Sequence, residues 1–581
     1  MEREKFVNKV RYTFGGSLLG LLVLGALGLT VAPVAAQEGL EDFQYWAQLC
    51  ASLAEEDKYE EAIAACDSAI ALNPKDVETW RDRAGILLEW QQYTQATAAY
   101  NRVLMLQPDD SLALADRCYA LSQLERYDVA IESCETALRV DRNWGEASPA
   151  LAWYHRGRAF RQLGEVKAAL DSFDWALELD RDYSAAAADR CQLLADLGDF
   201  EGALAACDRA LKADRRWSPS DPATVWETQG EIYIALDRYD RALDAFDRAL
   251  ALNPENADAW LQRAQLLDRL GRHGEAKIAY DWVVQIQPNS SLALARQCAN
   301  LNRLGSYEEA LAACEAALKE GDGIWGSEGP AFAWMHRGNA LAGLGNYEEA
   351  IASSNRAIAL APDYADAWSN RSVPLWHLGR DDEALAATER AIALDPNSSL
   401  AWYNQGRILK DLGEYDAAIA AYDRAIKGDA NIGDRPSLAQ IWINQSAVFL
   451  ILQEYGNALT VAQSATTTAP EQVAGWYNQG LALMALQRYE EAVEVYEKAI
   501  ELDPENADFW TGKGMALRAL EEYADALPAL ETAIQLNPTH PQALQTLEIV
   551  RRELQPEPPP PDAQNVPPKE TLPEVSPPAQ P

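Results

Sequence analysis

The sequence predicts an all-α solenoid built from repeated helical hairpins. Two observations point to this fold class: each copy of a recurring pattern holds two helical stripes, and the copies follow one another in phase. The stretch 475–504 shows the pattern. Trp476, Gly480 and Leu483 fall at i, i+4 and i+7, which places them on one face of a helix. A single hairpin cannot bury both of its faces, so it needs neighbours.

The second half of the same stretch predicts the second helix of the hairpin. Ala492, Tyr496 and Ala499 repeat the i, i+4, i+7 spacing after a short polar break. Pro504 ends this helix because proline lacks the N–H that a helix interior needs. The two stripes together make a seam in which small and large side chains alternate.

The same frame recurs fourteen times between about residues 43 and 540. Position 4 is Trp at residues 46, 80, 153, 226, 260, 334, 368, 402, 442, 476 and 510. The other three copies carry Leu114, Ala187 and Leu294 at that position. Position 20 is Ala in all fourteen copies, and we expect the position-4 tryptophans to lie in the core.

These residues resemble the tetratricopeptide repeat, which has Trp, Gly or Ala, Ala, Tyr or Phe, Ala and Pro at the same spacings in 34 residues. The resemblance covers about 43–540. It implies a right-handed superhelix whose concave groove binds other proteins. One departure is systematic, because position 7, often Leu in the family, is mostly Arg or Gln here. Examples are Arg83, Arg117, Arg156, Gln405 and Gln479.

The N-terminal residues 1–36 are predicted to be a signal peptide. A basic segment from Arg3 to Arg11 precedes the apolar run 15–32, and small residues then end the segment at Ala36. The apolar run is also about the minimum length for a membrane span, so a retained membrane anchor is the alternative. Both interpretations predict an exported, periplasmic or otherwise extracytoplasmic protein, which an anchor would attach to the inner membrane.

Four insertions divide the repeats into blocks. Loop-type segments rich in Gly, Pro, Ser and charged residues lie near 142–149, 215–222, 322–330 and 430–438. The resulting blocks are 43–144 with repeats 1–3, 150–217 with repeats 4–5, 223–324 with repeats 6–8, 331–432 with repeats 9–11 and 439–540 with repeats 12–14. This pattern indicates tandem duplication of a three-repeat unit, with one repeat lost.

The C-terminal end is predicted to hold a capping helix and a tail. Residues 541–554 form one more amphipathic pattern, which would cover the last apolar face of the solenoid. Residues 555–581 are so rich in Pro that they predict a disordered, polyproline-II-rich extension. That tail could be a ligand for a proline-reading domain, a spacer or an inert extension.

The eight cysteines fall in pairs separated by 16 residues, at positions 8 and 24 of their repeats. An antiparallel hairpin that folds about position 16 brings these two positions face to face, within disulfide range. Export to an oxidising compartment would allow the bonds, although Cys can also be a small buried hydrophobe. The predicted pairs are Cys50–Cys66, Cys118–Cys134, Cys191–Cys207 and Cys298–Cys314.

Composition and motifs disfavour several classes of function. The net charge of −39 repels nucleic acid and anionic lipid headgroups; it keeps a solenoid soluble or attracts basic partners. The five histidines are scattered, and no HExxH, GxxxxGK[ST] or GxSxG motif occurs. No His lies near the cysteine pairs at metal-ligand spacing. We therefore expect a protein without catalytic activity, metal or cofactor that does not bind nucleic acid.

The first helices suggest a binding face. Positions 2, 6, 9 and 13 lie about 180° from the buried stripe, and four successive repeats carry Asn at position 6: Asn370, Asn404, Asn444 and Asn478. Val373, Leu481 and Met515 flank this row with apolar side chains. The row resembles the asparagine ladder in the repeat arm of O-GlcNAc transferases, which implies that it holds extended peptide backbone. The transferase domain has no counterpart here, and Asn at this position could also be common without a ligand.

The function predicted from these features is a protein–protein interaction scaffold or adaptor of the cell envelope. It would bind peptide segments of other proteins in the concave groove of the solenoid. Two alternatives remain open at this point: a structural spacer anchored in the envelope, and a chaperone-like assembly factor.

Overall fold

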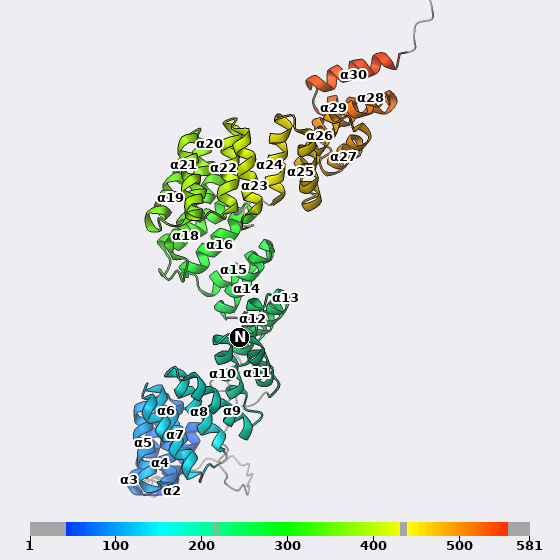
Figure 1. Cartoon of the computed structure of the whole chain (residues 1–581). Coiled ribbons are helices and arrows are strands. Elements are labelled where there is room, and N and C mark those ends of the chain that lie inside the picture. The colour runs from blue at the N-terminus through cyan, green and yellow to red at the C-terminus, as the bar shows by residue number, and fades with distance from the viewer. Residues whose placement is uncertain (1–41, 146, 214–216, 218–220, 430–437, 556–581) are drawn as a thin grey trace, which may run out of the picture. The chain divides into compact units, whose positions relative to one another are not determined.

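The computed structural model describes residues 42–145, 147–213, 217, 221–429 and 438–555, and these residues form 29 α-helices and no strand. Successive helices pack as antiparallel hairpins, and within each of the two units described below each hairpin packs against the next, as Figure 1 shows. The prediction of an all-α solenoid of helical hairpins is confirmed.

The chain divides between Ile286 and Gln287 into two compact units. This boundary lies inside the block of repeats 6–8 and not at an insertion. The helices of the first unit are α2 (Phe43–Glu55), α3 (Tyr59–Leu72), α4 (Val77–Glu89), α5 (Tyr93–Leu106), α6 (Ser111–Gln123), α7 (Tyr127–Val140), α8 (Pro149–Gln162), α9 (Val166–Leu179), α10 (Ser184–Asp196), α11 (Phe200–Ala213), α12 (Pro222–Ala235), α13 (Tyr239–Leu252), α14 (Ala257–Arg269) and α15 (His273–Ile286).

The second unit begins with the first helix of repeat 8. Its helices are α16 (Ser291–Leu304), α17 (Tyr307–Lys319), α18 (Gly329–Gly343), α19 (Tyr347–Leu360), α20 (Ala365–His377), α21 (Asp381–Leu394), α22 (Ser399–Asp411), α23 (Tyr415–Lys427), α24 (Leu438–Ile451), α25 (Tyr455–Thr468), α26 (Val473–Ala485), α27 (Tyr489–Leu502), α28 (Ala507–Ala519), α29 (Tyr523–Leu536) and α30 (Pro541–Glu553).

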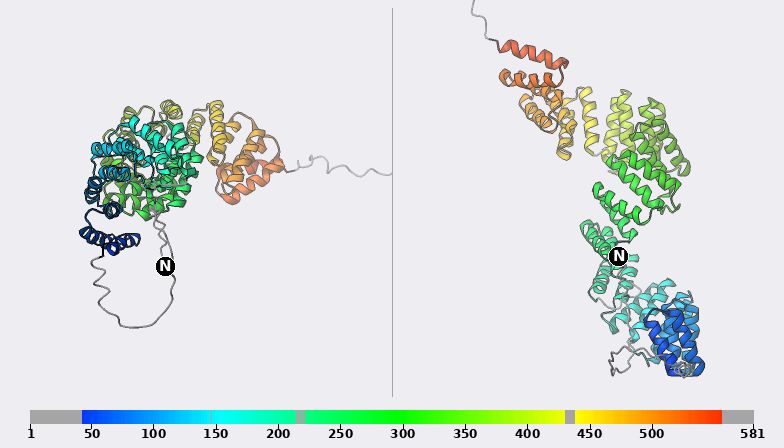
Figure 2. Two further views of the ribbon diagram at one scale, coloured as in Figure 1. Left: turned by 90° about the horizontal axis from the view of Figure 1, so that it is seen from below. Right: turned by 180° about the vertical axis from the view of Figure 1, so that it is seen from behind.

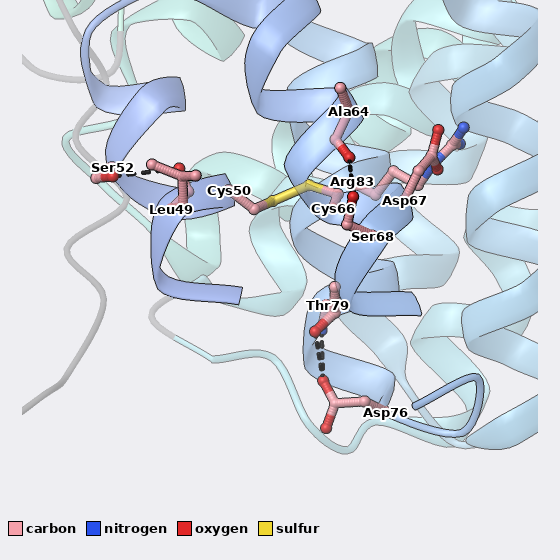
Figure 3. Close-up of a disulfide and its surroundings, with 10 residues drawn as sticks. All are labelled: Leu49, Cys50, Ser52, Ala64, Cys66, Asp67, Ser68, Asp76, Thr79 and Arg83. Atoms are coloured by element: carbon pink, nitrogen blue, oxygen red, sulfur yellow. Dashed lines mark hydrogen bonds and ion pairs between the residues drawn. A yellow bond between two sulfur atoms is a disulfide. The ribbon is translucent and has the colours of Figure 1, made fainter. Parts of the chain in front are cut away.

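The seam of each hairpin runs between position 8 of the first helix and position 24 of the second. In repeat 4, Gly157 faces the ring of Phe173 so closely that an added Cβ would lie 2.7 Å from it, and Gly480 faces Tyr496 in the same way. In four other repeats two cysteines occupy the same two positions. Figure 3 shows Cys50 of α2 joined to Cys66 of α3. In these repeats the small residue at position 8 either admits a ring or forms a bond.

All eight cysteines lie in four pairs at disulfide distance, and the pairs are those that the sequence predicts. Their Cα–Cα distances are 5.0, 5.5, 5.1 and 5.3 Å, in chain order. The sulfur-bearing side chains are almost completely buried.

The tryptophans at position 4 do not lie in the core as we expected, because each is only half-buried. Most of them use the indole N–H to hold the turn that precedes the helix. The Nε1 of Trp476 donates to the carbonyl of Pro470 at 2.8 Å, and that of Trp402 donates to the carbonyl of Pro396 at 2.9 Å. Since the indole must reach this carbonyl at the turn, its ring stays near the surface.

The polar residue at position 7 links neighbouring repeats, which explains its departure from the family pattern. Arg83 of α4 pairs with Asp67 of α3 at 2.6 Å, and Arg263 of α14 pairs with Asp247 of α13 at 2.7 Å. Figure 3 shows the first of these pairs. In each case position 7 reaches position 25 of the preceding repeat. A leucine could not make this contact.

The insertions after repeats 3 and 8 fold back onto the first helix of the repeat that they follow. In repeat 3 the hydroxyl of Ser111 donates to the carbonyl of Ala137 at 2.9 Å and accepts from the backbone N–H of Arg142 at 3.1 Å. In repeat 8 the hydroxyl of Ser291 accepts from the N–H of Gly323 at 2.9 Å. All four repeats that precede an insertion begin with a fully buried Ser: Ser111, Ser184, Ser291 and Ser399.

The insertions also supply tryptophans where position 4 lacks one. Trp144 packs in the same hydrophobic cluster as Leu114, and Trp217 packs in the same cluster as Ala187. Repeats 3 and 5 therefore recover from their insertions the large side chain that their first helices do not carry.

The last helix, α30, packs on α28 and α29, as the two views of Figure 2 also show. It buries Leu547 and Val550 against Leu517 and Leu530. The predicted signal peptide or anchor at 1–36 and the Pro-rich tail beyond Gln555 lie outside the described residues. Among the helices that the structure describes, none combines the length and the apolar character needed to span a bilayer.

Candidate peptide-binding groove

The asparagine row lies on the first helices of repeats 10 to 13, which are α20, α22, α24 and α26. Each Asn directs its Nδ2 to a group of the preceding repeat. The Nδ2 of Asn404 lies 3.1 Å from the hydroxyl of Ser369, and that of Asn478 donates to the carbonyl of Ile443 at 3.0 Å. Position 6 of one repeat is thus bonded to position 5 of the repeat before it.

The other two members of the row make the same link to different atoms. The Nδ2 of Asn370 lies 2.9 Å from the thioether sulfur of Met335. The Nδ2 of Asn444 donates to the hydroxyl of Tyr403 at 3.2 Å and to the carbonyl of Gln440 at 2.9 Å. The link to Tyr403 joins repeats 11 and 12, which the insertion near 430–438 separates in the sequence.

The expectation that these side chains face away from the packed interior is wrong for two of them. Asn404 is 4% exposed and Asn478 is 9% exposed, whereas Asn370 and Asn444 are half-buried. First helices of successive repeats touch one another directly on this side of the stack. Position 6 therefore sits in the contact between two first helices, and helical periodicity within one repeat does not reveal that contact.

The amide oxygens of three members of the row stay available. Among the described residues no group donates to the Oδ1 of Asn370, Asn404 or Asn478, and none of these oxygens is a fully buried unsatisfied atom. Only Asn444 has a donor to its oxygen, the Nζ of Lys410 at 3.5 Å. The row thus presents fixed hydrogen-bond acceptors.

Apolar side chains and one proline accompany the row. Val373, Leu481 and Met515 are half-buried at position 9 of their helices, so each leaves part of its surface exposed. Pro374 lies inside α20 and has no N–H to donate to the carbonyl of Asn370 four residues earlier. The carbonyl of Asn370 therefore lacks its usual helical donor.

Sequence reasoning missed a cationic group on the same face. Arg407 of α22 lies with its guanidinium carbon 4.3 Å from the centroid of the Trp376 ring and 5.6 Å from that of Tyr403. Lys410, one turn further on, is also half-buried. The sequence does contain an indication of this cationic group, because Arg407 and Lys410 are three residues apart and therefore lie on the same side of one helix. The aromatic partners come from other positions and could not be read from that spacing.

The first helices of the first unit carry a different, more acidic surface. Burial raises the pKa of Asp82 to about 7, and burial likewise raises that of Asp116 to about 7 despite a hydrogen bond from the Tyr100 hydroxyl at 3.3 Å. Further along, Arg158 pairs with Asp189 at 3.5 Å. The carboxylates on this surface are thus partly desolvated, and the arginine is already neutralised.

A small cavity of about 250 Å³ lies on this acidic surface, between α6 and α8. Its walls include Tyr119 and His155, whose rings stack 5.0 Å apart. Burial, with the nearby charge of Arg158, lowers the pKa of His155 to about 3, so this histidine is neutral at ordinary pH. In the part of the chain that the structure describes, no cluster of three or more His, Cys, Asp or Glu could hold a metal ion.

Comparison with known proteins identifies the repeats. Sequence profiles described as tetratricopeptide repeat match residues 53–115, 150–183, 183–255, 227–291, 335–399, 387–420 and 477–541. No curated protein matches the chain.

Several solved structures are similar to this chain at low sequence identity. The APC/C hetero-tetramer Cut9–Hcn1 aligns over 90% of this chain and 98% of its own, with 16% identity and a TM-score of 0.42. YrrB, described as a TPR protein with an unusual peptide-binding site, covers 34% of this chain and 97% of its own, with 22% identity and a TM-score of 0.30. PilW, described as a type IV pilus biogenesis factor, covers 35% and 91%, with 22% identity and a TM-score of 0.32. With the profile matches along most of its length, this chain belongs to the tetratricopeptide repeat family.

Proposed function

We propose that this chain is a protein-interaction scaffold of the cell envelope, and that it binds an extended segment of another protein along the first helices of repeats 10 to 14. Membership of the tetratricopeptide repeat family supports the role of a scaffold. The position of the segment and the envelope location are the specific parts of the proposal.

The observation that carries the proposal is the row of available amide oxygens. Because each Nδ2 is held by the preceding repeat, the amide cannot rotate freely and its Oδ1 keeps one direction. A peptide offers a backbone N–H at almost every residue, so such oxygens can hold a segment with little regard to its side chains. The exposed parts of Val373, Leu481 and Met515 would add apolar contact, and Met adapts to different partners.

The envelope location is supported by the cysteines. All eight lie in pairs at disulfide distance, and such bonds persist in oxidising compartments. The predicted export segment at 1–36 is consistent with this location.

The test is a peptide selection on the full chain followed by affinity measurements on variants. Leu481→Lys and Val373→Lys place a charge on the half-buried floor of the groove without removing an inter-repeat hydrogen bond. Each should weaken the selected peptides at least about tenfold, because an ammonium group replaces an apolar contact. Asn→Ala variants are a poorer test, since Asn404 and Asn478 also hold the repeats together.

The matched control is Thr467→Lys, which adds the same charge at an exposed site on α25, a second helix. It should leave peptide affinity unchanged. Selected peptides that bind the Leu481→Lys and Val373→Lys proteins as tightly as the wild type would show that the groove is assigned wrongly. A selection that yields no binding peptide would favour a structural spacer.

A further inference from the structure

The groove contains an arginine that no carboxylate neutralises. Arg407 makes no ion pair with any residue that the structure describes, and its guanidinium lies over the rings of Trp376 and Tyr403. Arginines on the first helices of the other unit behave differently. Arg81 pairs with Asp110 at 2.6 Å, and Arg158 pairs with Asp189.

The rings beneath Arg407 are themselves fixed. The Nε1 of Trp376 donates to the carboxylate of Asp411 at 3.0 Å. Tyr403 is 4% exposed, and its hydroxyl accepts from the Nδ2 of Asn444. A guanidinium stacked on two immobile rings keeps its orientation, so it loses little rotamer freedom when it binds a partner.

A second cation stands beside the first. The Nζ of Lys410 lies 3.5 Å from the Oδ1 of Asn444 and 3.5 Å from the carboxylate of Asp411. Arg407 and Lys410 against Asp411 leave one excess positive charge at this point. In a chain with a net charge of −39, solubility does not explain an excess of positive charge inside a groove.

We propose that Arg407, with Lys410 beside it, is the subsite for an acidic side chain, Asp or Glu, of the segment that the groove holds. This inference rests on the proposed function. A carboxylate matches the planar fork of a guanidinium and can accept two parallel hydrogen bonds from it. Asn404, on the same helix, and Asn370, one repeat earlier, would hold the backbone on one side of that residue.

The experiment selects short peptides on the full chain from two libraries, one with free and one with amidated C-termini. Affinities of the selected peptides and of their Glu→Gln or Asp→Asn versions are then measured on wild type, Arg407→Gln and Arg407→Lys. We expect an acidic residue at one fixed internal position in both libraries. Its neutralisation should cost at least about tenfold on wild type and little on Arg407→Gln, with Arg407→Lys in between.

The matched control is Arg424→Gln, which removes the same charge from the exposed second helix of the same repeat. It should bind like wild type. Peptides that need no acidic residue and bind Arg407→Gln unchanged, yet lose affinity on Leu481→Lys, would overturn this inference and leave the groove in place. If peptides bound only when their C-terminus was free, and needed no internal acidic residue, the subsite would recognise a C-terminal carboxylate. That result would overturn the assignment to an acidic side chain. Peptides insensitive to Leu481→Lys as well would overturn the proposed function itself.

Discussion

The residue at position 8 decides how each hairpin closes. At Gly157 and Gly480, an aromatic ring from the second helix fills the space, whereas Leu530 fills it at Gly514. Where position 8 is Cys, a second Cys faces it at a Cα–Cα distance of 5.0–5.5 Å. The two solutions occupy the same two positions of the frame.

The first prediction is that Gly157→Ala destabilises the protein by about 1–3 kcal/mol, because its Cβ would meet the Phe173 ring at 2.7 Å. Chemical denaturation of the first unit would measure the change. Gly85→Ala is the matched control, since nothing lies within 4 Å of an added Cβ in the same kind of helix. It should be neutral or stabilise by up to about 1 kcal/mol. If the two changes had equal effects on stability, the close contact between Gly157 and the Phe173 ring would not be what makes the glycine necessary.

A buried carboxylate makes the stability of the first unit depend on pH. Burial raises the pKa of Asp116 to about 7, above the value of an unfolded chain, so the folded state holds its proton more tightly. The protonated carboxyl of Asp116 therefore contributes fully to the free energy of unfolding when the pH is below the pKa that this group has in the unfolded chain. This contribution is lost as the pH rises toward 7. Wild type should therefore lose up to about 4 kcal/mol between pH 4 and 7 through this group.

Asp116→Asn keeps an acceptor for the Tyr100 hydroxyl but cannot ionise. Its unfolding free energy should fall less than that of wild type over the same pH range, as measured by urea titrations at each pH. Identical slopes for the two proteins would mean that Asp116 does not titrate as its burial implies.

At the scale of elements, one buried serine joins the insertion to its repeat in repeats 3 and 8. The hydroxyl of Ser111 links the end of α7 and the insertion to the start of α6. Position 1 of the frame is a buried Ser in every repeat that precedes an insertion, and it is not Ser in any other repeat. The insertion and the serine at position 1 therefore occur together in the frame.

Ser111→Ala should destabilise the first unit by about 1–3 kcal/mol, because the N–H of Arg142 loses its acceptor in a part-buried site. Hydrogen exchange of the Arg142 amide should also become faster. Ser122→Ala on the same helix is the comparison: its hydroxyl bonds only the carbonyl of Cys118 in its own helix, so the change should stay within about 0.5 kcal/mol. Unchanged exchange at Arg142 would show that the serine does not hold the insertion.

The cysteine seam should be replaceable by the aromatic one. Changing Cys118 and Cys134 to Ala removes a bond that closes a loop of 16 residues and should cost about 3 kcal/mol. The pair Cys118→Gly with Cys134→Phe copies the seam of repeat 4 and should recover part of that loss through ring burial. Thermal unfolding of the three proteins gives the order; a Gly/Phe protein no better than the Ala/Ala protein would refute the equivalence.

At the scale of the whole molecule, the disulfide-distance pairs are unevenly distributed. Three of the four lie in the first unit, and only Cys298–Cys314 lies in the second. The second unit relies instead on ring-filled seams such as Gly406 with Tyr422, and on small polar seams such as Ser372 with Thr388.

Reduction should therefore weaken the first unit more than the second. In envelope-purified protein, mass spectrometry of unreduced digests should find the four predicted pairs, and a reductant should lower the unfolding transition of the first unit most. Hydrogen exchange resolved by segment separates the two transitions. Free thiols at all eight cysteines would contradict both the bonds and the export.

The sequence by itself determined the fold class, the repeat register and the cysteine pairing. All three depend on local features: helical periodicity places the stripes, and each hairpin folds about its own turn with partners 16 residues apart. The asparagine row and its apolar neighbours were also visible, because they recur at one position of the frame.

The tertiary structure decided how neighbouring repeats use their polar residues. Nothing in a 34-residue pattern shows how far one hairpin rotates against the next, and that rotation brings Asn404 to Ser369, Arg263 to Asp247 and Arg407 over Trp376. It also buries Asn478. The contacts of Asn404, Arg263 and Arg407 join side chains on different helices, at distances between 2.7 and 4.3 Å. Small differences in packing set them, and the periodicity of hydrophobic residues carries no information about such differences.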